Sequence, residues 1–154
     1  MRFDFRPLSR EDVDALVAWH YEPPYHEYDP AYDPSDVREM QAAVGSATWF
    51  VIDDADGALA GFVVCRIGQD EVEVGLGLRP DLTGRGIGPP FIEAIVEVVR
   101  ARWDPAHVTL DVLPWNERAI RAYERVGFAR GELYERRFDD GKLNTFLRMQ
   151  RRLR

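Results

Sequence analysis

Cysteine and long apolar runs are scarce in this 154-residue chain, and each scarcity excludes a class of protein. The single cysteine, Cys65, can form neither an intrachain disulfide nor a thiolate metal cluster, which is typical of a protein in a reducing cytoplasm. The three histidines follow no metal-ligand spacing, so we expect no metal. No apolar run approaches the roughly 20 residues that a membrane span requires, so we expect no membrane partner.

Positive charge is also in deficit. The 20 Lys and Arg residues are outnumbered by 27 Asp and Glu residues, which gives a net charge of −7. An acidic chain gains no electrostatic attraction to a phosphate backbone, so we expect no nucleic-acid partner. The deficit is uneven, because residues 1–70 hold 5 cations and 14 anions (−9) whereas residues 71–154 hold 15 cations and 13 anions (+2).

The size and the hydrophobic pattern indicate one α/β domain over residues 1–154. Strands are predicted at 2–8, 48–52, 59–67, 71–78, 108–112, 128–138 and 143–149. Helices are predicted at about 10–20, 34–44, 91–103 and 116–126. The fourth and fifth strands flank a helix, so we expect them to be parallel and the others antiparallel. The result is a mixed, mostly antiparallel sheet of about seven strands with about four helices, closed by a turn at Asp139–Lys142.

A glycine-rich segment, residues 79–88, leads from the fourth strand into the third helix. Gly84, Gly86 and Gly88 allow the backbone to approach a ligand closely, and the following helix start favours an anion. These features predict a phosphate cradle. The spacing fits neither a P-loop nor a dinucleotide fingerprint. A flexible turn without a ligand is the alternative.

A second pattern covers the fourth predicted helix. Asn116, Ala119, Tyr123 and Gly127 are spaced by three, four and four residues, which places them along one stripe of the helix. A small residue and a phenol on one face fit a narrow slot with a proton donor at one end. Alternatively, Asn116 only caps the helix and Tyr123 only packs.

Together the two segments resemble the signatures of the GNAT superfamily of acetyl-coenzyme A-dependent N-acetyltransferases. The family's pyrophosphate loop reads [QR]-x-x-G-x-[GA], and the segment 83–88 matches it at Gly86 and Gly88. The family's second signature, N-x-x-A-x-x-x-Y-x-x-x-G-F, is matched at every fixed position from Asn116 to Phe128. The predicted order of strands and helices is also similar to the family's. The resemblance implies the GNAT fold, with a sheet that splays between its fourth and fifth strands.

The resemblance implies acetyl-coenzyme A as the co-substrate. Backbone groups of Leu76, Gly77 and Leu78 would hold the pantetheine arm and the acetyl carbonyl. Asn116 would contact the pantetheine end, and Tyr123 would bind near the thioester sulfur and protonate the leaving thiolate as a general acid. The loop residues that would bind the pyrophosphate are Thr83, Gly84, Arg85, Gly86, Ile87 and Gly88.

Two departures from the family pattern concern the affinity for the cofactor. Thr83 stands where the family prefers Gln or Arg, so one side-chain contact is expected to be missing. Pro89 and Pro90 open the next helix, and each removes an N–H group that would otherwise bind phosphate. Both changes predict weaker cofactor binding rather than a different fold.

The reaction also needs a base and an acceptor site. Glu73 is the candidate base, because it lies on the polar face of the fourth strand; a solvated strand face is the alternative. Tyr21, Tyr25 and Tyr28 belong to a proline-rich loop that covers the acceptor in this superfamily. Their rings fit a cationic amine. Alternatively, these tyrosines only fasten the loop to the core.

We therefore expect an enzyme that transfers an acetyl group from acetyl-coenzyme A to a primary amine by direct attack on the thioester. The acceptor is either a small molecule or a protein amine, and the acidity of residues 1–70 favours a cationic one. The alternative is a non-catalytic acyl-coenzyme A-binding regulatory module, which would not need Tyr123. Longer acyl donors stay open, as does the choice between a monomer and a homodimer.

Overall fold

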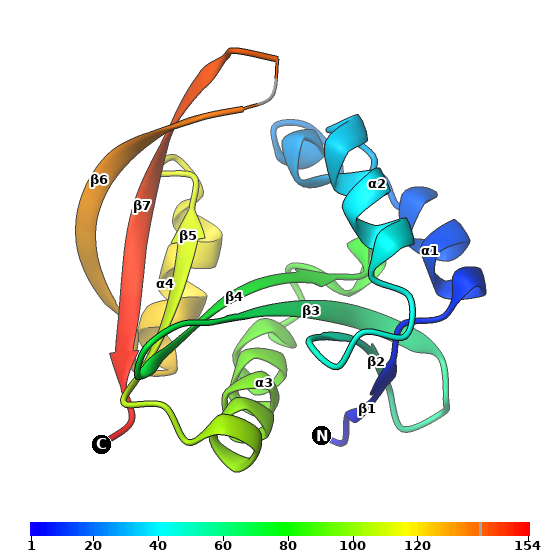
Figure 1. Ribbon diagram of the computed structural model, residues 1–154, viewed down its shortest axis with the longest axis horizontal. Helices are drawn as coiled ribbons and strands as arrows, with labels where there is room; N and C mark the ends of the chain where they lie inside the picture. The colour runs from blue at the N-terminus through cyan, green and yellow to red at the C-terminus, as the bar shows by residue number, and fades with distance from the viewer. Residues whose placement is uncertain (139) are drawn as a thin grey trace. The chain divides into compact units, whose positions relative to one another are not determined.

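The computed structural model describes residues 1–138 and 140–154, which form seven strands and four α-helices (Figure 1). The strands are β1 (Asp4–Pro7), β2 (Trp49–Asp53), β3 (Leu59–Ile67), β4 (Glu71–Leu78), β5 (His107–Val112), β6 (Ala129–Arg137) and β7 (Leu143–Arg152). The helices are α1 (Arg10–Val17), α2 (Pro34–Ala42), α3 (Gly88–Trp103) and α4 (Glu117–Arg125). Short 3-10 turns occur at Tyr25–Tyr28 and Pro80–Leu82. The predicted α/β class is confirmed, while Asp139 of the predicted last turn lies outside the described residues.

The strands form one mixed sheet in the order β1-β2-β3-β4-β5-β7-β6. Strand β4 pairs with β5 in parallel, as predicted, and the pairs β1–β2, β2–β3, β5–β7 and β6–β7 are antiparallel. The parallel ladder runs from Glu71–His107 to Glu73–Thr109. Both strands continue beyond that point, β4 to Leu78 and β5 to Val112. The short ladder agrees with the predicted splay between these strands.

The chain folds into two compact units. The first unit comprises residues 1–64 and 76–83, and the second unit comprises residues 65–75 and 84–154. In the first unit, α1 begins at a capping box in which Ser9 and Asp12 exchange side-chain and backbone hydrogen bonds. Its helices and strands enclose one apolar cluster: Leu8, Val13, Leu16, Trp19, Met40, Trp49, Val51 and Val64.

In the second unit, α3 buries one apolar face, and β7 of the long β6–β7 hairpin buries Phe146, Leu147 and Met149. Figure 1 shows the long hairpin that β6 and β7 form. The buried face of α3 consists of Phe91, Ile92, Ile95, Val96 and Val99. A Cβ atom on Gly88 would lie 3.7 Å from the Cβ of Ala122, so α3 and α4 approach closely at that point. The first residue of α3, at the end of the glycine-rich loop, is therefore held beside the second half of α4.

Several predicted boundaries differ from the observed ones, and two of the differences have a clear local cause. Helix α1 ends at Val17 rather than His20, because Trp19 turns into the core and its N–H bonds the carbonyl of Leu16. Strand β7 continues three residues past Met149, because Arg151 and Arg152 still pair with β5 although they are charged. Charge at a strand end hides the period-two signal on which a sequence prediction depends.

Candidate functional site

The glycine-rich loop lies in the second unit from Gly84 onward, and its backbone is open. Gly84 and Gly86 have φ angles of +73° and +77°, which side chains other than glycine's rarely adopt. A Cβ atom on Gly86 would meet nothing within 4 Å. A Cβ atom on Gly84 would lie 3.8 Å from Nη1 of Arg118, a cation at the start of α4 that sequence reasoning missed. The loop thus combines accessible backbone with a neighbouring guanidinium group, as an anion site requires.

The first turn of α3 contributes little to this anion site. Pro89 and Pro90 carry no N–H group, and the N–H of Phe91 bonds the carbonyl of Ile87 at 3.0 Å. Among the described residues of this turn, Gly88 is left as the N–H donor. The expected loss of phosphate-binding groups at these prolines therefore has a structural counterpart, and any cradle depends on the amides of the loop.

Helix α4 gives the second signature a structural role at each end. Asn116 is buried, and its Oδ1 accepts a hydrogen bond from the N–H of Ala119 at 3.2 Å, which caps the helix. At the other end, Gly127 has a φ of +91°, and the N–H of Phe128 bonds the carbonyl of Tyr123. The half-buried Tyr123 ring packs edge-on against Phe128 at 5.9 Å. Capping and packing both occur, and neither role excludes contact with a ligand.

Glu73 belongs to an ionic cluster in the second unit rather than to an open strand face. Its Oε1 accepts a hydrogen bond from Nη2 of Arg148 at 2.8 Å, and its Oε2 lies 3.4 Å from Nη1 of Arg66. Arg148 also donates to both oxygens of Asp111, through Nε at 2.7 Å and Nη2 at 3.2 Å. The hydroxyl of Tyr134 donates to Asp111 as well. The carboxylate of Glu73 is thus ion-paired and about one-quarter exposed.

Burial of Tyr134, together with its hydrogen bond to Asp111, raises the pKa of its phenol above the ordinary value of about 10. The phenol therefore stays protonated and donates to Asp111 at neutral pH. Sequence reasoning missed Asp111, Tyr134 and Arg148. The available signal was the strict alternation of β5, which places Asp111 on the face opposite the apolar Leu110 and Val112.

In the first unit, the end of β4 is packed under an aromatic side chain. A Cβ atom on Gly77 would lie 2.3 Å from the ring of Phe62, so only glycine fits there. Phe62 in turn stacks on Trp49 at 5.7 Å. The next residue, Leu78, accepts a hydrogen bond on its carbonyl from the hydroxyl of Tyr21 at 2.6 Å. Tyr21 therefore contacts the strand that was expected to hold the cofactor.

The aromatic loop of the first unit is tied to itself by one carboxylate. Asp29 accepts hydrogen bonds from the N–H of Tyr21 at 2.7 Å and lies 3.0 Å from Nδ1 of His20. Tyr25 and Tyr28 are half-buried at the two ends of the 3-10 turn. Near the end of this unit, the hydroxyl of Thr83 donates to the carbonyl of Pro80 at 2.7 Å, so this side chain is engaged by its own turn.

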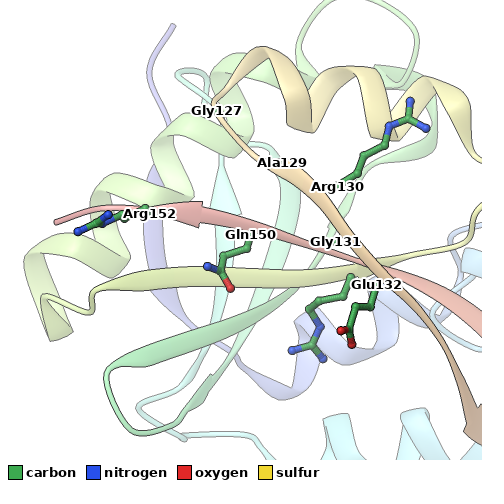
Figure 2. Close-up of a pocket in the computed structure, with 8 residues that line it drawn as sticks. Gly127, Ala129, Arg130, Gly131, Glu132, Gln150 and Arg152 are labelled. Atoms are coloured by element: carbon green, nitrogen blue, oxygen red, sulfur yellow. The ribbon is translucent and has the colours of Figure 1, made fainter.

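A surface hollow of about 600 Å³ lies along β6 and β7, and of the residues that the sequence singled out it includes Gly127 (Figure 2). Its lining residues are Gly127, Ala129, Arg130, Gly131, Glu132, Arg148, Gln150 and Arg152. In Figure 2 the side chain of Arg130 points toward α4, where it pairs with Glu124 at 3.3 Å. The hollow shares Arg148 with the ionic cluster around Glu73.

The residues of the second unit fit the phosphate end of a coenzyme A group, because two left-handed glycines and Arg118 leave room and charge for an anion. In the described residues, no group of three or more His, Cys, Asp or Glu side chains is placed to hold a metal ion. Over the same residues, no helix is both long enough and apolar enough to cross a membrane.

Comparison with known proteins identifies the family of this chain. A model described as "Acetyltransferase (GNAT) domain" matches residues 2–129. The mycothiol acetyltransferase of Propionibacterium freudenreichii subsp. shermanii is 31% identical over 132 residues, which cover 77% of this chain and 40% of that protein. The chain spans less than half the length of such curated relatives.

Solved structures share the fold. A spermidine N-acetyltransferase SpeG chimera from Vibrio cholerae and hSSAT has a TM-score of 0.78 and 21% identity, with 99% of this chain and 96% of that chain covered. A structure of AAC(6')-Ib in complex with parmomycin and acetyl-coenzyme A has a TM-score of 0.75 and 20% identity, with 99% and 94% covered. At these identities the likeness concerns the fold.

Proposed function

The chain belongs to the GNAT acetyltransferase family, and on that premise we propose that it transfers an acetyl group from acetyl-coenzyme A to a primary amine. The observation that carries the proposal is the joint presence, in one unit, of the open glycine loop and the capped helix with Tyr123. Acetyl-coenzyme A would supply an activated thioester carbonyl. The single buried cysteine is consistent with work in a reducing cytoplasm.

On the cofactor side, we propose that backbone N–H groups of the loop bind the pyrophosphate. The loop residues are Thr83, Gly84, Arg85, Gly86, Ile87 and Gly88, and Arg118 adds a cation that the sequence analysis did not include. Leu76, Gly77 and Leu78 would present backbone groups to the pantetheine arm. Asn116 would contact its end with the amide nitrogen, because its oxygen is used by the helix cap.

On the chemical side, Tyr123 would protonate the leaving thiolate from the last turn of α4. Its ring is fixed by Phe128, which limits the positions of the hydroxyl. Glu73 remains the candidate to accept the proton of the attacking amine. Because Arg148 and Arg66 hold its carboxylate, Glu73 would act through a bound water or through a change in its pairing with Arg66, the longer of the two contacts.

The acceptor belongs to this proposal as well. Relatives and structural neighbours carry names such as mycothiol acetyltransferase and spermidine N-acetyltransferase, so amines of different chemistry are acceptors in the family. Tyr25 and Tyr28 would line the acceptor side. Tyr21 would contribute through Leu78 rather than by touching the acceptor, because its hydroxyl is already bonded there.

The decisive experiment is a free-thiol release assay with acetyl-coenzyme A against a chemically diverse panel of amines. Turnover of at least one amine, with acetylation confirmed by mass spectrometry, supports the proposal. Saturable binding of acetyl-coenzyme A without thiol release from any amine favours the non-catalytic module instead. Absence of acetyl-coenzyme A binding would contradict both.

A further inference from the structure

Arg148 is held rigidly at one end and is available at the other. Its Nε and Nη2 groups are engaged by Asp111 and Glu73, whereas no acceptor lies within hydrogen-bond distance of Nη1 in the described part of the chain. The side chain is one-third exposed and lines the hollow on β6 and β7. A guanidinium group fixed in this way presents N–H donors in a set direction, which is how arginine recognises carboxylates and phosphates.

Two more donors continue the same row. Arg148, Gln150 and Arg152 alternate along β7 and therefore share one face, with a spacing of roughly 7 Å between successive side chains. Arg152 donates through Nε to the main-chain oxygen of Arg154 at 2.9 Å, and no ion pair joins it to an Asp or Glu side chain among the described residues. Gln150 is exposed. The row thus offers two guanidinium groups and an amide, and the carboxylates that bind Arg148 engage its Nε and Nη2 rather than Nη1.

The facing strand makes room for a ligand. Across from this row, the lining consists of the small residues Gly127, Ala129 and Gly131. Gly131 lies against the backbone of β7, because a Cβ atom there would come within 2.9 Å of the carbonyl oxygen of Arg148. Ala129 pairs directly with Gln150. Glu132 is the acidic residue of the lining, and the Arg130 side chain points toward α4 (Figure 2). Next to Gln150 on β5, the buried hydroxyl of Thr109 has no hydrogen-bond partner within the described residues, which marks a polar group left unsatisfied.

We propose that the hollow on β6 and β7 binds an oxyanion of the acceptor, a carboxylate or a phosphate, through Arg148, Gln150 and Arg152. The acceptor would then carry an acidic group in addition to its amine. The inference rests on the proposed function, because Glu73 is the candidate base and bonds the same guanidinium group. An oxyanion on Nη1 would lie within roughly 6 Å of the Glu73 carboxylate. This separation fits an acceptor whose amine and acid are only a few bonds apart.

The test compares matched amines in the thiol release assay. Phenylalanine is compared with phenylalanine amide and 2-phenylethylamine for the carboxylate, and O-phosphoethanolamine with ethanolamine for the phosphate. In at least one set, we expect kcat/KM to be at least about tenfold higher for the amine that bears the acidic group. The difference should lie in a lower KM. Inorganic phosphate should compete with the amine that bears the acidic group, because a free anion would occupy the same hollow. Equal kcat/KM values within every set would overturn the proposal.

Variants separate recognition from folding. Arg148→Gln removes the cation that Asp111 and Glu73 share and can fail to fold, so Arg152→Gln and Gln150→Ala are the informative changes. Each should reduce the preference for the acid-bearing amine at least threefold and leave its neutral partner unchanged. Arg100→Gln, on the exposed face of α3, removes a cation of the same unit and should change neither value. A preference that survives both β7 variants would count against the hollow.

The oxyanion site can also be tested if the protein proves not to acetylate any amine. If no amine is turned over, the hollow is tested by titrating the 15N-labelled protein with acetate and inorganic phosphate, up to about 50 mM. Saturable shifts of the Gly131 and Gln150 amides that weaken in Arg152→Gln support the oxyanion site. Shifts confined to the glycine loop, residues 84–88, would overturn it.

Discussion

The hydroxyl of Tyr21 donates a hydrogen bond to the carbonyl of Leu78 at 2.6 Å, across 57 positions of the chain. This contact links the loop expected to cover the acceptor with the strand expected to hold the pantetheine arm, inside one compact unit. From its sequence, Tyr21 is predicted to contact the acceptor. The structure bonds Tyr21 to β4, next to Gly77 and its covering ring, so we propose that it positions this strand.

Tyr21→Phe should therefore affect the acetyl donor more than the amine. We expect a loss of about 1 kcal/mol in the free energy of unfolding, because one part-buried hydrogen bond is removed. The KM for acetyl-coenzyme A should rise more than the KM for the acceptor. Steady-state kinetics, with each substrate varied in turn, measures the two KM values. Tyr32→Phe, at an exposed tyrosine of the same loop, is the control and should alter neither KM.

Two glycines with positive φ angles allow a loss of stability to be separated from a loss of coenzyme A binding. Gly86→Ala should cost about 1 kcal/mol in stability, because alanine resists a φ of +77°, and should weaken coenzyme A binding at least tenfold. Gly57→Ala is a matched control, with a φ of +81° and equally open space in the β2–β3 turn. Its stability loss should be similar, with coenzyme A affinity unchanged by calorimetry. Equal affinities for both variants would argue against the loop as the phosphate site.

Tyr123→Phe tests the proposed general acid. The ring contact with Phe128 is kept, so the free energy of unfolding and the affinity for coenzyme A should change little. The value of kcat should fall by about 10²-fold, the usual contribution of a positioned proton donor. Steady-state assays of thiol release measure kcat. Unchanged turnover in this variant would remove the assignment of Tyr123.

Much of the fold follows from local sequence. The capping box of Ser9 and Asp12, the Asp33–Pro34 helix start and the alternation of β4 were all readable, because each depends on neighbours in the chain. The segment 116–128 was readable for the same reason. Its cap, its left-handed glycine and its buried phenylalanine all lie within one helix and its end.

The parts that sequence did not predict depend on contacts between distant residues. Glu73 and Arg148 are 75 positions apart, and no local pattern announces their ion pair. Likewise, Arg118 comes beside Gly84 only because α3 and α4 pack closely. The face of β4 that is polar in the sequence is thus part of an ionic cluster in the fold. Glu73 is ion-paired there instead of being a free carboxylate.

Cys65 should be nearly inert toward thiol reagents. Burial raises the pKa of its thiol to about 12, so the thiolate is a minute fraction at pH 8. Native protein should react with a disulfide reagent far more slowly than the urea-unfolded chain, in which one thiol per chain reacts at once. The same property leaves the thiol release assay without a protein background. Rapid reaction of the native protein would contradict the burial of Cys65.

The ion pairs of Asp12 give the first unit a dependence on acid. Burial alone would raise the pKa of this carboxyl, but hydrogen bonds from Arg6 and Ser9 outweigh it and hold the pKa below the ordinary value of about 3.9. A group whose pKa is lowered by folding stabilises the protein above its unfolded pKa, and that contribution is lost as the pH falls through the folded pKa. Asp12→Asn should cost about 2 kcal/mol at pH 7, because Arg6 and the helix cap lose a charged partner.

The difference between the wild-type protein and Asp12→Asn should narrow as the pH falls below about 4, where the wild-type carboxyl begins to be protonated. Urea unfolding at a series of pH values measures both curves. Asp14→Asn, at an exposed carboxylate of the same helix, should leave the wild-type curve unchanged. A constant difference between the proteins down to pH 2 would show that Asp12 stabilises α1 through neutral hydrogen bonds rather than through its charge.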